Sequence, residues 1–226
     1  MATITDFLNK LKNYGELTEG ELTEGIVQPY FRKSLIKNID KTCCTESEVE
    51  VYDFDECKTI LTRKKDMQLP KSCDALKIEA EQEKIYFIEF KRWQTFIERQ
   101  LITANNSLGK VETQVDKFNI LTKLSDSLFL LNTIIQESNF KITVEEKKNY
   151  LATPKQMILL VDIHLANPIQ KIAATLSALA STSSSPEILI QQSLEDKINS
   201  IPIEGLSNIQ PILLKNCTSI DDYFTI

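Results

Sequence analysis

The 226-residue chain is poor in glycine and histidine, with five glycines and a single histidine. It contains no glycine-rich phosphate-binding loop, which argues against an ATP-driven enzyme within this chain. One histidine cannot form a histidine-rich metal site. No apolar run approaches the roughly 18 residues that a membrane span needs, and the N-terminal stretch has no continuous apolar segment. We therefore expect neither a membrane span nor a secretory signal.

The five cysteines lack the spacing of a metal site. Their number is odd, no C-x-x-C pair occurs, and adjacent Cys43 and Cys44 give poor chelate geometry. Without an export signal, we expect reduced thiols in a cytoplasmic protein.

The net charge of −6 argues against binding nucleic acid through bulk electrostatics, because such proteins are usually basic. The charge is unevenly spread. Residues 58–100 carry ten Lys or Arg against seven Asp or Glu, whereas the rest of the chain is strongly acidic. We expect any nucleic-acid contact in this basic stretch.

Hydrophobic periodicity predicts an α/β fold with a central mixed β-sheet flanked by helices. Residues 181–187 are rich in serine and predict a linker, so we divide the chain into a core, 1–180, and a C-terminal extension packing on it, 181–226. The predicted strands are 47–54, 58–62, 72–79, 84–91 and 156–165, and the predicted helices are 24–40, 111–137 and 168–180, with a further helix in the extension.

The segments 72–79 and 84–91 predict a β-hairpin joined by a four-residue polar loop. A symmetric loop pairs residues whose numbers sum to 163, so that Asp74 opposes Glu89, with Lys91 on the same face. Two carboxylates with Cβ atoms ~5 Å apart repel unless one takes a proton or a cation lies between them. Lys91 supplies one positive charge, and a Mg²⁺ ion would supply two.

This set of side chains suits phosphodiester hydrolysis. A metal polarises the phosphoryl oxygen and acidifies a bound water, while Lys91 orients that water, helps to deprotonate it, or stabilises the charged transition state. The alternative is an exposed hairpin face with a solvated Glu89–Lys91 pair. Apolar residues on the same face favour burial instead, and buried charges are rare without a partner or a function.

The pattern "SCDALKIE", a short loop and "IYFIEFKR" resembles the PD-(D/E)XK nuclease superfamily. Its signature is an aspartate on one strand and Glu-x-Lys on the next, often after a helix bearing a glutamate. The resemblance implies that Asp74, Glu89 and the backbone carbonyl of Phe90 bind metal and that Lys91 is the catalytic lysine. The upstream glutamate would map to Glu24.

The resemblance implies a restriction-endonuclease-like core with a helical C-terminal extension. The chain departs from the motif at Cys73, which replaces the proline, and Pro29 lies close to Glu24. The implied activity is a Mg²⁺-dependent deoxyribonuclease, with Mn²⁺ as a substitute, acting on DNA in a restriction, repair or mobile-element context. We also consider a homodimer, since cutting both strands takes two active sites.

Two alternatives remain open on the sequence alone. One is a catalytically inactive protein of the same fold that binds nucleic acid or a protein partner. The other is an α/β domain whose hairpin acids have no connection with metal.

Overall fold

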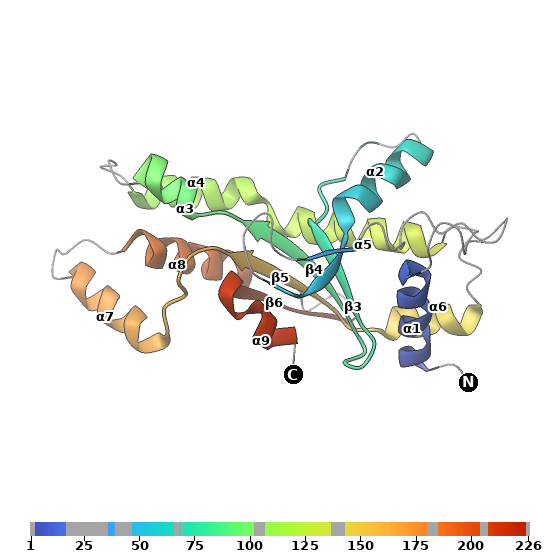
Figure 1. Cartoon of the computed structure of the whole chain (residues 1–226). Coiled ribbons are helices and arrows are strands. Elements are labelled where there is room, and N and C mark those ends of the chain that lie inside the picture. The colour runs from blue at the N-terminus through green and yellow to red at the C-terminus, as the bar shows by residue number, and fades with distance from the viewer. Residues whose placement is uncertain are drawn as a thin grey trace.

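The structure, a computed structural model, describes residues 3–16, 36–38, 47–65, 68, 70–101, 107–136, 143–179, 185–203 and 208–224. Within these residues, six strands form one sheet in the order β1-β2-β3-β4-β5-β6 (Figure 1). Strands β1 to β4 pair antiparallel, and β4, β5 and β6 pair parallel, which confirms the predicted mixed sheet. The strands are β1 Ile36–Asn38, β2 Glu50–Asp53, β3 Ala75–Glu79, β4 Lys84–Lys91, β5 Lys155–Val161 and β6 Ile209–Asn216.

Helices cover both faces of the sheet unequally. The larger hydrophobic core lies on the face of the sheet that α4 and α5 cover, and α1, α2, α6 and α8 contribute to it. The smaller core on the other face is closed by α9 at the C-terminal end (Figure 1). The helices are α1 Ile4–Glu16, α2 Phe54–Lys65, α3 Gln94–Phe96, α4 Ser107–Phe118, α5 Ile120–Gln136, α6 Val144–Ala152, α7 Pro168–Leu179, α8 Pro186–Asn199 and α9 Ile220–Phe224, with a π-helical turn over Ile97–Leu101 and a 3-10 turn over Cys217–Ser219.

The predicted hairpin and its register are confirmed. Strands β3 and β4 pair with Leu76 opposite Phe87 and Ile78 opposite Ile85, so paired residue numbers sum to 163. Leu76, Ile78, Ile85 and Phe87 belong to the larger core, whereas the apolar alternate residues Ala75, Tyr86 and Ile88 belong to the smaller one. Alternation along β4 therefore directs Glu89 and Lys91 to the face that α4 and α5 cover.

The predicted single helix over 111–137 is wrong, because Asn119 divides it into α4 and α5. Asn119 has a φ of 50°, a left-handed conformation that asparagine tolerates better than most residues. At the break, Ile120 is buried, while Leu121, which fitted the uninterrupted pattern, is exposed. Further along α5, Leu124, Leu131 and Ile135 are buried as the pattern predicts.

Residues 58–62 were predicted as a strand, and they are helical. They lie in α2, where Phe54, Cys57 and Leu61 are buried at helical spacing and the Asp53 carboxylate accepts a hydrogen bond from the amide of Glu56. Short apolar runs do not separate strand from helix by periodicity.

The C-terminal extension is not purely helical. Its predicted helix is α8, but the following apolar run forms β6, which adds a parallel strand beside β5. Side chains of β6 thereby join both cores of the sheet.

The cysteines do not all carry reduced thiols. Cys217 is disulfide-bonded, so the expectation of five reduced thiols is wrong, whereas Cys57 and Cys73 are buried and take part in no disulfide. No helix of the described segments has the length and apolar character to cross a membrane.

Glu24 and most of the predicted helix 24–40 lie outside the described residues, although Ile36–Asn38 is a strand.

The left-handed residue between α4 and α5 gives a testable prediction. Asn119→Ala should lower the free energy of unfolding by about 1 kcal/mol, because alanine disfavours a positive φ. Asn119→Gly should leave it within about 0.5 kcal/mol of the wild type, since glycine adopts this conformation freely. Urea denaturation measures both, and an alanine variant as stable as the glycine variant would contradict the left-handed break.

Candidate active site

Glu89 is a buried carboxylate at the carboxyl end of β4. The residue is 3% exposed, and its Oε1 atom lies 2.7 Å from Nζ of Lys123 on α5. Its Oε2 atom is buried and has no hydrogen-bond partner among the described residues. Because an unsatisfied buried oxygen is unfavourable, this side chain needs a reason beyond packing.

Asp74 lies directly before β3, beside Glu89. Its Oδ2 atom accepts a hydrogen bond of 2.8 Å from the amide of Phe90, and its backbone carbonyl accepts one of 3.0 Å from the amide of Phe54. These bonds hold Asp74 against the end of β4, where the hairpin register would place it opposite Glu89. The structure therefore brings the two predicted acids together.

The pKa of Glu89 reflects this arrangement. Burial raises it first and the charge of Asp74 raises it further, to about 8, although Lys123 opposes both effects. Burial alone would lower the pKa of Lys123, but the charges of Glu89 and Asp74 outweigh that effect and raise it. The ammonium of Lys123 thus interacts with both carboxylates.

Lys91 lies on the same face, as predicted. Its Nζ atom is 5.0 Å from the centre of the Phe118 ring at the end of α4, and Nζ of Lys123 is 5.6 Å from the same ring. Cations are attracted to the face of an aromatic ring at such distances. Two ammonium groups from different elements therefore share one ring, and that of Lys123 also contacts Glu89.

Helix α5 packs over the site and hydrogen-bonds to the segment that leads into β3. Besides the Lys123–Glu89 pair, its Asp126 carboxylate accepts a 2.6 Å hydrogen bond from the amide of Lys71, and its Ser127 hydroxyl accepts one of 2.8 Å from the amide of Cys73. These contacts fix Lys71 and Cys73, which lie in the segment that leads into Asp74 and β3. Burial, and then the charge of Glu89, raises the pKa of the Cys73 thiol, which keeps it protonated.

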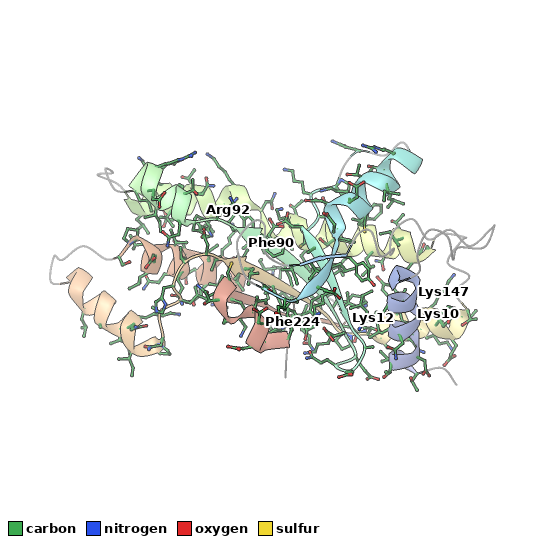
Figure 2. All side chains as sticks on the ribbon, in the orientation of Figure 1. Lys10, Lys12, Phe90, Arg92, Lys147 and Phe224 are labelled. Atoms are coloured by element: carbon green, nitrogen blue, oxygen red, sulfur yellow. The ribbon has the colours of Figure 1, made fainter. Side chains whose placement is uncertain are left out.

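The segment that follows β4 is held in place by Asp162. The Asp162 carboxylate, after β5, accepts hydrogen bonds of 2.5 Å and 3.2 Å from the amides of Trp93 and Gln94. Trp93 is fully buried in the larger core, so it packs rather than contacts a ligand. Arg92 is exposed, and Figure 2 labels it with Phe90, the two residues that flank Lys91.

Sequence reasoning missed Lys123, Phe118 and Asp55. The charge of Asp55, in the first turn of α2, raises the pKa of Glu89 slightly, so this third acid lies near the site. The only signal for Lys123 was its position one turn before Ser127, on the flank of the buried stripe. That position predicts a half-buried lysine but not its partner.

The donor set suits a hard divalent cation in part. Asp74 and Glu89 offer carboxylate oxygens, and the unpartnered Oε2 of Glu89 is available to a ligand, which matches the preference of Mg²⁺ for oxygen. No group of three or more acidic, histidine or cysteine side chains with metal-binding geometry occurs within the described segments. Glu24, the expected further acid, lies outside them.

Comparison of the chain with protein-family models, with curated proteins and with solved structures gave no match. The chemistry of the site therefore carries the functional argument.

The raised pKa of Glu89 predicts how stability depends on pH. In the folded protein this carboxyl binds a proton more tightly than in the unfolded chain, so its contribution to stability is full below about pH 4.5 and is lost as the pH rises through about 8. Glu89→Gln removes this loss. In EDTA, the stability of the wild type should therefore fall relative to the variant by up to about 1.4 kcal/mol per pH unit in that window.

Urea denaturation of both proteins between pH 5 and pH 9 measures the difference. Glu112→Gln is the control, because Glu112 is exposed on α4 and should follow the wild type. Parallel curves for the wild type and Glu89→Gln would contradict the raised pKa.

Proposed function

We propose that the protein is a metal-dependent nuclease that hydrolyses DNA phosphodiester bonds. The observation that carries the proposal is the position of Asp74 and Glu89, held together at the end of β4 with the ammonium of Lys123 beside them and Lys91 on the same face of the strand. Carboxylates in this arrangement repel each other and offer a site to a divalent cation.

In the proposed mechanism, Asp74 and Glu89 would hold Mg²⁺ together with the backbone carbonyl of Phe90. The metal would supply Lewis acidity toward a phosphoryl oxygen and would lower the pKa of a water. The Phe90 amide fixes the Asp74 carboxylate at the end of β4. Lys91 lies on the same face of β4 as Glu89, over the Phe118 ring, and it would orient the attacking water or neutralise the charge that develops on the phosphate.

The order of elements supports a restriction-endonuclease-like core. An antiparallel meander, β2-β3-β4, is followed by α4 and α5 and then by β5, which pairs parallel with β4. Asp74 lies directly before β3, and Glu89 and Lys91 lie on β4, the last strand of the meander. This order is the one that the sequence resemblance implies, and it is the basis for extending the proposal from site to fold.

DNA as the substrate is supported by a positive side chain at the carboxyl end of β4. Arg92 directly follows the strand and is exposed, and Arg63 on α2 is a further exposed basic residue. Such groups contact phosphates without reading sequence.

One observation favours a second candidate, a catalytically inactive protein of the same fold that binds nucleic acid or a protein. Lys123 already neutralises Glu89 at 2.7 Å, so the acid pair has a cation of its own. The two candidates differ in whether a divalent metal takes effect at this pair.

We predict that the protein nicks supercoiled plasmid in Mg²⁺ or Mn²⁺ and not in EDTA. Asp74→Asn and Lys91→Ala should each lower the nicking rate at least about 100-fold, because each removes a group that acts on the reacting phosphate. Both variants should still bind a short duplex in a gel-shift assay, since the exposed basic residues are unchanged.

Lys84→Ala is the matched control, because Lys84 lies at the other end of β4 and contacts the Tyr86 ring on the opposite face. It should cut like the wild type. Binding of DNA without cutting in either metal would favour the inactive candidate, and an absence of both would overturn the proposal.

A further inference from the structure

The candidate site already holds a cation against its buried acid. Lys123 on α5 interacts with both Glu89 and Asp74, while Lys91 on β4 lies over the Phe118 ring that Lys123 shares. The closest contact is the 2.7 Å pair between Nζ of Lys123 and Oε1 of Glu89. The motif that predicted the acids accounts for Lys91 but has no place for this second cation.

A dication and Lys123 compete for the same carboxylate. Two positive groups within a few ångströms of each other repel strongly where water is largely excluded, and Glu89 is almost completely buried. A metal held by Glu89 and Asp74 therefore either binds weakly or moves the ammonium of Lys123 away from Oε1.

The side chain of Lys123 can move away from Glu89 more easily than Glu89 can move. Its side chain is 21% exposed, whereas that of Glu89 is 4% exposed, so the lysine reaches the acid from the solvent side. Its long, flexible side chain starts in the first turn of α5. Its ammonium already lies over the Phe118 ring, which offers a second favourable position for the positive charge. Glu89, on the central strand β4, has no comparable freedom.

We propose that Lys123 is a resident counter-ion of the site, which neutralises the acid pair in the metal-free protein and gives up its contact with Glu89 when a divalent metal binds. This inference rests on the metal site of the proposed function. Lys123 is then a positioning residue that stabilises the empty site and, for the same reason, lowers its affinity for metal.

This role predicts a result opposite to that of an ordinary structural lysine. If Lys123 only supported the shape of the site, its removal would weaken metal binding. If it competes with the metal, Lys123→Met should bind Mg²⁺ and Ca²⁺ at least about 10-fold more tightly than the wild type, while its metal-free form should melt at a lower temperature. Added metal should restore more of its melting temperature than it adds to the wild type.

Isothermal titration of the metal-free full chain with Mg²⁺, and separately with Ca²⁺, tests the inference without relying on activity. Lys117→Met is the matched control, because Lys117 is exposed on α4 next to Phe118, and it should bind metal like the wild type. Lys123→Arg keeps the positive charge and should not bind more tightly than the wild type. It also covers the case in which the methionine variant does not fold.

The outcomes separate this inference from the proposed function. Metal binding that Asp74→Asn abolishes but Lys123→Met fails to tighten would overturn the counter-ion and leave the metal site standing. An arginine variant that binds metal more tightly than the wild type would also overturn the counter-ion. A lack of metal binding by the wild type and every variant would overturn the metal site, and the inference with it.

Discussion

The structure of this site depends on one buried carboxylate, Glu89, and on what neutralises it. A charge at the end of a central strand is unfavourable in a core unless it is paired and hydrogen-bonded. Lys123 meets one oxygen of Glu89, and the other has no partner among the described residues. An apolar pair at these two positions would fill the same space without that penalty. That the chain keeps the charges is therefore an argument for chemistry at this place.

The elements around Glu89 serve to hold its neighbours in place. The left-handed Asn119 ends α4 and restarts the helix as α5, which brings the Phe118 ring and Lys123 to the same point above β4. Ser127, one turn further along α5, binds the amide of Cys73 and so fixes the residue before Asp74. Rigid elements thus position Glu89, Lys91 and Lys123, and Asp74 lies at the last position before β3.

Local pattern predicted the hairpin well, because strand alternation and a short polar loop determine which residues face each other. It placed Asp74, Glu89 and Lys91 on one face, and the structure agrees. It failed in two places. The left-handed Asn119 divides one predicted helix into two. Residues 58–62 contain too few apolar positions to separate strand from helix. Lys123 escaped notice because a lysine on the flank of a helix shows its partner only after packing. Glu24 stays a prediction.

The charge of the whole molecule gives the site a further constraint. The chain carries a net charge of −6. An acidic protein repels a phosphodiester, which is itself an anion. A bound dication would make the field at the site more positive, and an ammonium released from Glu89 would add to that change. If the proposed nuclease activity holds, the metal therefore does more than assist the chemistry. It also draws the scissile phosphate to Asp74 and Glu89, while the exposed basic residues contact the duplex with or without metal.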